Sequence, residues 1–154
     1  NYIVGAMVWN LNDFYSEARR NAMPHVNNKG LVSTDRERKD GYYLYQAYLK
    51  EEPVLHIASK SWKNRAGASR DGKSCTQPLK VYTNADKVEV FLNGKSLGVY
   101  PVSDKVVSVD IPFVNGENVV DAVISLPSAR TAFPVSLSIS VPLTVYSLPG
   151  SRFV

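Results

Sequence analysis

The sequence predicts a mainly β protein, in which an immunoglobulin-like antiparallel β-sandwich follows a single βα unit. From about Val54 onward, apolar residues alternate with polar ones, which is typical of strands that bury one face. Asn93-Gly94 and Asn115-Gly116 indicate hairpin turns, because both residue types tolerate positive φ. Before this region, an apolar run, a polar loop and a helical pattern form the βα unit. We therefore expect two domains, over residues 1–51 and 52–154.

The second region contains the predicted strands of the sandwich. Six or seven short antiparallel strands over about a hundred residues fit an immunoglobulin-like fold. Pro142 lies inside the last one and predicts a bulge, a strand switch or an edge, because proline donates no ladder hydrogen bond. Residues 60–77 are polar and rich in Gly, Ser and Lys, and we expect a mobile loop there. The predicted strands cover residues 54–58, 79–83, 88–92, 106–113, 119–125 and 135–145.

The first region is predicted to be one strand, one long loop and one helix. Residues 2–9 are mostly apolar without alternation, as in a parallel strand that is covered on both faces. Residues 10–30 form a polar loop, and a helix follows over residues 35–50, with Thr34 and Glu37 at the spacing of a capping box. A lone βα unit cannot bury its own strand, so it should belong to a larger body. We expect four tyrosines to pack the helix against that body: Tyr42, Tyr43, Tyr45 and Tyr48.

Composition and charge exclude several classes of function. The 154 residues carry 18 Lys and Arg against 14 Asp and Glu, a mild and scattered excess, so we expect no nucleic-acid partner. The single Cys75 cannot form an internal disulfide. His25 and His56 show no paired metal-ligand spacing, so neither a metal nor another cofactor is expected. No run approaches the length of a membrane span, and we expect no membrane partner.

Two motifs in the first region resemble the last βα unit of the catalytic (β/α)8 barrel, or TIM barrel, of glycoside hydrolase family 2. This family includes β-galactosidases, β-glucuronidases and β-mannosidases. The resemblance implies that residues 1–51 are the C-terminal end of such a barrel. The motifs are Gly5-x3-Trp9-Asn10-x2-Asp13-Phe14 and Asn27-Asn28-Lys29-Gly30-Leu31-Val32-x2-Asp35-Arg36-x2-Lys39-Asp40-x-Tyr42-Tyr43.

Three further motifs resemble the sandwich that follows the barrel in the bacterial β-galactosidase branch of this family. The likeness covers residues 1 to about 125, and it is specific because the motifs occur in combination. It supports an immunoglobulin-like domain over residues 52–154. The motifs are Trp62-x-Asn64-Arg65, Leu79-Lys80-Val81-Tyr82-x-Asn84 and Val88-x-Val90-Phe91-Leu92-Asn93-Gly94-Lys95-x-Leu97-Gly98.

The resemblance implies a retaining exo-β-glycosidase, and it favours a β-galactosidase that hydrolyses terminal β-galactosides. A retaining mechanism uses two carboxyl groups about 5 Å apart. In the family both are glutamates on earlier barrel strands, so we expect no catalytic residue in this chain and no activity from the chain alone. One alternative is a β-glucuronidase of the same family. An alternative from another class is a non-catalytic sandwich that binds carbohydrate or acts as a spacer.

The resemblance implies four substrate-binding residues, namely Trp9, Asp13, Asn27 and Lys29. Trp9 is expected to stack on the sugar, the alternative being a core tryptophan beneath the barrel rim. Asn27 and Lys29 match an Asn-x-Lys motif that binds the 6-carboxylate in β-glucuronidases of the family, but galactosidases of this branch often carry it too. A solvated lysine remains the alternative for Lys29. Asp13 either touches the sugar or braces the loop.

The expected partners are a carbohydrate substrate, the rest of the catalytic barrel and possible further copies in a homo-oligomer. Family habit favours a periplasmic or secreted parent protein. A strand over residues 2–9 would have unpaired edges outside its barrel. We therefore expect residues 1–50 to pack on the sandwich, on another copy of the chain or on other barrel segments.

Overall fold

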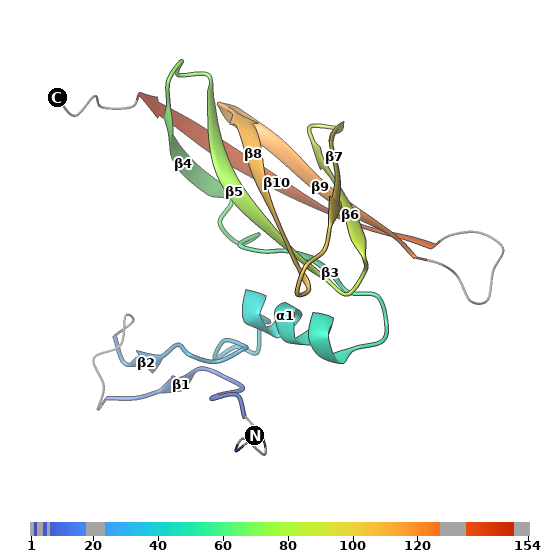
Figure 1. Cartoon of the computed structure of the whole chain (residues 1–154). Coiled ribbons are helices and arrows are strands. Elements are labelled where there is room, and N and C mark those ends of the chain that lie inside the picture. The colour runs from blue at the N-terminus through green and yellow to red at the C-terminus, as the bar shows by residue number, and fades with distance from the viewer. Residues whose placement is uncertain (1, 3–4, 6, 18–23, 127–134, 150–154) are drawn as a thin grey trace.

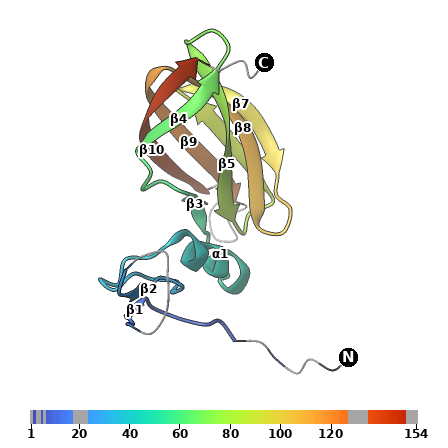
Figure 2. The ribbon, with the colours of Figure 1, turned by 90° about the vertical axis from the view of Figure 1, so that its left-hand side faces the viewer.

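The computed structural model describes residues 2, 5, 7–17, 24–126 and 135–149, and it confirms the mainly β fold class. Two short strands, β1 (Phe14–Tyr15) and β2 (Val26–Asn27), pair with each other and precede the helix α1 (Asp40–Leu49). The strands β3 to β10 then form the sandwich. Figures 1 and 2 show that α1 lies between the sandwich and the β1–β2 pair.

The sandwich consists of two sheets, as the sequence predicts. One sheet has the order β3 (Leu55–Ile57), β5 (Ser74–Thr83), β8 (Val106–Val114), and both of its pairings are antiparallel. The other sheet has the order β4-β10-β9-β6-β7 and is antiparallel except for the parallel pair of β4 and β10. Its strands are β4 (Asn64–Ser69), β6 (Lys87–Leu92), β7 (Lys95–Pro101), β9 (Gly116–Leu126) and β10 (Val135–Pro149).

The core of the sandwich is built by the predicted alternation of apolar residues. In β8 every second side chain is buried, and Phe113 and Ile111 are fully so. The alternate residues of β9 and β10 are buried likewise, among them Val120, Ile124 and Val145. Each fully buried side chain of this size contributes roughly 1.5–3 kcal/mol through removal of apolar surface from water. The period-two pattern therefore determines which face of each sheet turns inward.

The two predicted hairpin turns have different outcomes. Asn93 and Gly94 have φ of 51° and 77° and join the paired strands β6 and β7, which confirms that hairpin. The prediction for Asn115-Gly116 is wrong, because this turn joins β8 of one sheet to β9 of the other. Gly116 has the positive φ expected of a turn, at 100°. A local turn signal reports the backbone conformation but not which strands pair on either side.

The loop predicted over residues 60–77 is wrong, because β4 and the first part of β5 lie there. Strand β4 has little apolar pattern of its own, and it forms because β10 pairs with it from Asn64–Thr144 onward. Pro142 lies just before this pairing begins, so it occupies a stretch of β10 whose only paired neighbour is β9. This location agrees with the predicted edge.

A tight turn around Asp71 connects β4 and β5. The Asp71 carboxylate accepts hydrogen bonds from the amides of Lys73 and Ser74 and from the Ser69 hydroxyl. Because all three favour the ionised form, they lower the pKa of Asp71 to about 2. The following residue, Gly72, has a φ of 68°. These local hydrogen bonds explain how a polar, glycine-containing segment forms an ordered hairpin.

The helix begins later than predicted, and the predicted capping box is wrong. α1 starts at Asp40, and the preceding residue Lys39 makes no side-chain cap. The segment before it is a turn in which the Ser33 hydroxyl accepts hydrogen bonds from the amides of Asp35 and Glu37. Ser33 thus binds the amides of a non-helical turn, and Thr34 has no capping role.

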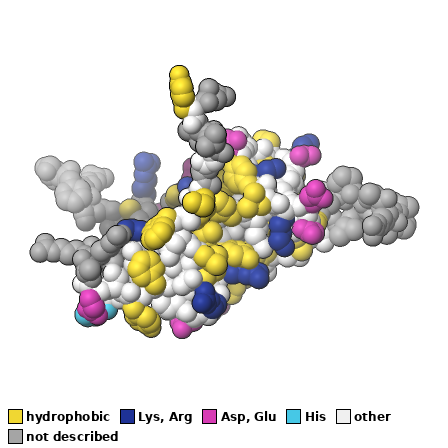
Figure 3. All heavy atoms as spheres, turned by 90° about the horizontal axis from the view of Figure 1, so that it is seen from below, with side chains coloured by type: hydrophobic (Ala, Val, Ile, Leu, Met, Phe, Trp, Pro, Cys, Tyr) yellow, Lys and Arg dark blue, Asp and Glu magenta, His cyan; other side chains and the backbone are white. Residues whose placement is uncertain are grey.

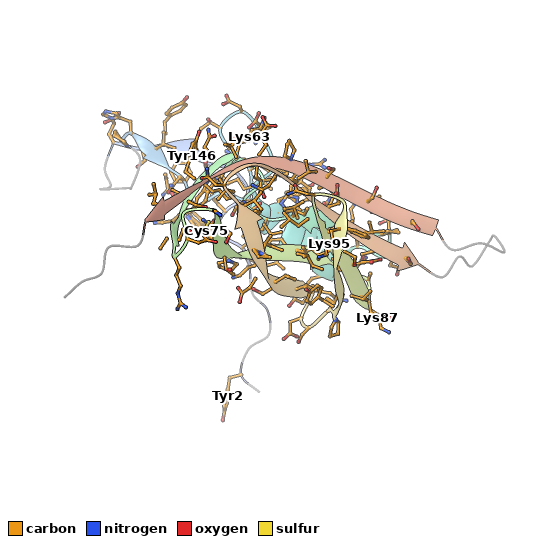
Figure 4. The ribbon with its side chains drawn as sticks, turned by 90° about the horizontal axis from the view of Figure 1, so that it is seen from above. Tyr2, Lys63, Cys75, Lys87, Lys95 and Tyr146 are labelled. Carbon is orange, nitrogen blue, oxygen red and sulfur yellow. The ribbon has the colours of Figure 1, made fainter. Side chains whose placement is uncertain are left out.

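The strand predicted over residues 2–9 is also wrong for its described part. Residues 2, 5 and 7–9 lie in no strand; residues 3, 4 and 6 fall outside the described residues. Met7 is 98% exposed, and Tyr2 stands away from the body of the molecule in Figure 4. A strand needs hydrogen-bonding neighbours, and the first β-bridge in the described segment occurs only at Asn12.

The helix packs on the sandwich through Asp40, and this confirms part of the expectation for residues 1–50. One carboxylate oxygen of Asp40 lies 2.8 Å from His56 Nε2, and the other accepts the amide of Ser59 at 2.8 Å. The Tyr43 ring stacks on His56 with centroids 3.8 Å apart, and the Tyr48 hydroxyl donates to the Asp104 carbonyl. These two tyrosines contact the sandwich; their expected packing against a barrel stays a prediction.

Burial makes His56 sensitive to pH. Its ring is almost fully buried, and this desolvation lowers the pKa below the ordinary value of 6.5 although Asp40 acts in the opposite direction. Because a carboxylate only accepts hydrogen bonds, the neutral imidazole donates from Nε2 to Asp40. The unfolded chain binds a proton at His56 more readily than the folded chain does. Its stabilising contribution is therefore complete above pH 6.5 and is lost as the pH falls below that value.

We expect the free energy of unfolding to decrease between pH 7 and pH 5, and to decrease less in a His56→Gln variant. Glutamine keeps a donor for Asp40 but has no proton to gain. Urea denaturation at both pH values measures this difference. The matched control is His25→Gln, because His25 is exposed. An equal pH dependence in wild type and His56→Gln would contradict the assignment.

Candidate functional site

The candidate site is the loop that joins β2 to α1, together with the segment that precedes β1. The backbone of residues 10–13 runs beside that of residues 31–32. The amides of Leu31 and Val32 donate to the carbonyls of Asn10 and Leu11, at 3.1 and 2.9 Å, and the amide of Asp13 donates to Val32 at 2.9 Å. These bonds bring the two motifs of the first region together in one small substructure.

The Asp13 carboxylate lies at the centre of this substructure. It is 7% exposed, and its Oδ1 accepts hydrogen bonds from the Gly30 amide at 2.8 Å and from Lys39 Nζ at 2.6 Å. The Lys39 ammonium also donates to the carbonyl of Asn28 at 3.0 Å. Asp13 and Lys39 thus hold the segment from Asn28 to Gly30 from two sides. These contacts give Asp13 a bracing role and do not test a sugar contact.

Gly30 lies where no other residue fits. A Cβ added there would overlap the backbone of Asn12 and Asp13. The close approach lets the Gly30 amide reach the buried carboxylate of Asp13. The glycine in the second motif is therefore explained by packing of backbone on backbone.

Asn27 is fully buried, and one of the two polar atoms of its side-chain amide lacks a hydrogen-bond partner. Its Oδ1 accepts the amide of Lys29 at 3.4 Å. Within the described residues, neither its Nδ2 nor the Oδ1 of Asn10 has a hydrogen-bond partner. Buried polar groups in folded proteins are almost always paired. Asn27 Nδ2 is an exception to this rule among the described residues.

Lys29 and Trp9 are the exposed members of the predicted site. Among the residues that the structure describes, no carboxylate forms an ion pair with Lys29. Trp9 is 71% exposed, so it is not part of the core formed by the described residues, and its peptide bond to Asn10 is cis. The structure thus places Asp13, from the segment before β1, beside the loop that carries Asn27 and Lys29, and it leaves Trp9 exposed earlier in the segment of Asp13.

Lys39 is a residue whose role the sequence analysis missed. It appears in the second motif, but a lysine just before a helix carries no local signal that it binds a carboxylate 26 residues earlier. No group of three or more His, Cys, Asp or Glu side chains could hold a metal ion in the described ranges. No helix there is both long and apolar enough to cross a membrane.

A Gly30→Ala substitution should open the loop. We expect the amides of residues 30–32 to exchange with solvent roughly 5- to 30-fold faster, which corresponds to a local loss of one to two kcal/mol. Hydrogen exchange followed by mass spectrometry measures this. Gly5→Ala is the matched control, since a Cβ at Gly5 meets nothing within 4 Å. Unchanged exchange in Gly30→Ala would show that the tight packing is not required.

Comparison with known proteins gives a consistent group of relatives. Residues 75–125 match a family model described as a domain of unknown function, DUF4982. A β-glucuronidase of Bacteroides fragilis is 33% identical over 124 residues, which are 77% of this chain and 17% of that protein. A β-galactosidase of Bacteroides ovatus is 35% identical over 100 residues, which are 64% of this chain and 11% of that protein.

A solved structure extends the match to most of the chain. The crystal structure of a Bacteroides uniformis β-glucuronidase superposes with a TM-score of 0.81 at 35% identity, over 92% of this chain and 16% of that one. The chain therefore spans less than a fifth of the length of these relatives. It contains a DUF4982 domain and is homologous to one part of bacterial β-glucuronidases and of a β-galactosidase.

Proposed function

We propose that the chain is part of a retaining exo-β-glycosidase that releases a terminal β-glucuronic acid residue. The observation that carries this proposal is Lys29 in the Asn-x-Lys motif. Lys29 is exposed, and among the described residues no carboxylate forms an ion pair with it. An ammonium group suits a carboxylate better than a hydroxyl, because charge-assisted bonds are roughly twice as strong as neutral ones. Asn27 is fully buried and its Oδ1 accepts the amide of Lys29, so we assign it to holding the backbone at Lys29.

The relatives also favour a β-glucuronidase. Those at 33% and 35% identity include β-glucuronidases of two Bacteroides species. A β-galactosidase remains the second candidate, because the relative from Bacteroides ovatus has that activity in its name. The sequence analysis favoured the galactosidase, and the exposed Lys29 together with these relatives reverses that order in our proposal.

Within this proposal, the remaining site residues have distinct roles. Trp9 offers an exposed ring on which the apolar face of the sugar stacks. Asp13 braces the loop through Gly30 and Lys39. The acid and the nucleophile of a retaining mechanism are two carboxyl groups about 5 Å apart. We propose that both are glutamates on barrel strands outside this chain.

The exposed apolar surface of the first region supports its assignment to a barrel. Figure 3 shows hydrophobic side chains gathered on the underside of the molecule. A surface of this kind marks a site of association. We propose that residues 1–51 complete a TIM barrel whose other strands cover these side chains, and that residues 52–154 form the following domain. The exposed large apolar residues in this region include Met7, Trp9, Leu11, Tyr15 and Leu49.

A non-catalytic carbohydrate-binding or spacer sandwich is the alternative from another class. It requires an exposed aromatic platform on the sandwich, and Trp62 is 70% exposed beside a hollow lined by Asn64, Arg65 and Gln77. We favour the enzyme, because the relatives are glycosidases by name.

The test of the glucuronidase proposal is an activity panel on the full-length protein. We expect nitrophenyl β-glucuronide to be cleaved in preference to β-galactoside and β-mannoside. Lys29→Ala should lower kcat/KM for the glucuronide about 10- to 100-fold, which corresponds to loss of a bond to a charged group worth 1.5–3 kcal/mol. Lys50→Ala, at an exposed position past the helix, is the control. Preferential cleavage of the galactoside with little effect of Lys29→Ala would favour the second candidate.

The isolated 154-residue chain should hydrolyse none of the three substrates, because the proposed catalytic carboxyl groups lie elsewhere. A purified sample incubated with each nitrophenyl glycoside checks this by absorbance. The full-length protein serves as the positive control. Turnover by the isolated chain would mean that it holds its own pair of catalytic carboxyl groups.

A further inference from the structure

We propose that Lys39 is a positioning residue that holds the substrate loop of residues 27–30 in its binding conformation. The inference rests on the function proposed above and adds to it a residue that touches no substrate. Lys39 acts through two groups, the Asp13 carboxylate and the Asn28 carbonyl, to which its ammonium donates at 2.6 and 3.0 Å. The loop that it holds carries Lys29, the exposed donor that we assign to the carboxylate of the sugar, and Asn27, whose buried side chain accepts the Lys29 amide.

Lys39 controls the loop because Asp13 is buried. A carboxylate that is 7% exposed needs charged or polar partners that compensate for lost hydration. Here the partners of Oδ1 are Lys39 Nζ and the Gly30 amide. Without the ammonium, the Asp13 carboxylate loses its charged partner and must turn toward water, which weakens its bond to Gly30. The segment between Asn27 and Gly30 then loses both of its anchors.

The backbone of Lys39 is itself fixed, so its side chain has a rigid base. Its amide donates to the Leu31 carbonyl at 3.0 Å, and its carbonyl accepts the amide of Tyr42 in the first turn of α1. The next residue, Asp40, binds His56 and Ser59 of the sandwich. Lys39 therefore links the loop to the helix, and through the helix to the sandwich. Supporting contacts of this kind are what keep binding groups in the productive geometry.

The test compares five variants of the full-length protein: Lys39→Met, Lys39→Arg, Asp13→Asn, the double variant Lys39→Met/Asp13→Asn and the control Arg38→Met. Arg38→Met removes one positive charge at the neighbouring position, where the guanidinium lies over the ring of Tyr42. Two quantities are measured: KM and kcat for nitrophenyl β-glucuronide, and deuterium uptake of residues 26–32.

We expect Lys39→Met to raise KM about 10- to 100-fold with a much smaller change in kcat, the size of effect that a small displacement of a positioned group produces. Deuterium uptake of residues 26–32 should increase in the same variant. Lys39→Arg should restore most of the binding, and Arg38→Met should resemble wild type in both measurements. The double variant Lys39→Met/Asp13→Asn should have a KM no higher than that of the more impaired single variant, because both changes remove the same ion pair.

Several results would overturn the proposal. One is a wild-type KM in Lys39→Met, and another is an equal rise in KM for Arg38→Met. If the melting temperature shows that Lys39→Met does not fold, Asp13→Asn decides, since it keeps an oxygen for Gly30 but loses the charge. A wild-type KM in Asp13→Asn would then reject the role of Lys39.

Failure of the proposed function gives a different pattern. If the wild-type protein cleaves galactoside and not glucuronide, the glucuronidase assignment fails, and KM for the galactoside replaces the first measurement. A rise in that KM with increased uptake in Lys39→Met still supports positioning by Lys39. Unchanged KM and unchanged uptake reject it for either substrate.

Discussion

The contact between Asp40 and the sandwich is the interaction on which the arrangement of the whole chain depends. Asp40 is the first residue of α1, and its two oxygens bind His56 of β3 and the amide of Ser59 beyond it. A carboxylate so bound has little freedom to move, because two donors fix both of its oxygens. This side chain fixes the helix start, and with it the adjacent Lys39 and the loop that Lys39 holds, relative to the sandwich; Tyr43 and Tyr48 add further contacts.

Asn84 provides the second attachment between the two regions. Its amide nitrogen donates to the carbonyls of Lys50 and Glu52, and its oxygen accepts the amide of Val54. The chain between α1 and β3 is therefore bound to the sandwich along its length. Together with Asp40, this makes the proposed link between a barrel and its following domain a packed junction with few free backbone groups.

Much of the fold could be predicted from the sequence, and the failures have physical reasons. The predicted strands that carry alternating apolar residues all exist, since each buries one face in the common core. β4 was missed because Asn64-Arg65-Ala66-Gly67-Ala68-Ser69 has no such alternation and is ordered by pairing with a strand from the far end of the sequence. The capping box failed because Ser33, not Thr34, binds the amides of Asp35 and Glu37.

The candidate site was only partly predictable. The resemblance located Trp9, Asp13, Asn27 and Lys29, and the structure places Asp13 beside the loop that carries Asn27 and Lys29. The resemblance could not show that Asp13 is buried or that Lys39 binds it, because these two residues are distant in the sequence and meet only in the folded chain. The lack of a hydrogen-bond partner for Asn27 Nδ2 likewise depends on the packed structure and cannot be predicted from the sequence.

The pairing of β10 has a consequence for how the molecule folds. β10 pairs with β9, its neighbour in sequence, over Val135–Val145, and it pairs in parallel with β4 from Thr144 onward, where Thr144 lies opposite Asn64. Contacts between such distant residues require closure of a long loop, and they slow folding relative to local hairpins. During synthesis β4 has no strand to pair with until β10 has been made. The five-stranded sheet is therefore completed at β4 as one of the final steps, after the β9–β10 and β6–β7 hairpins have formed.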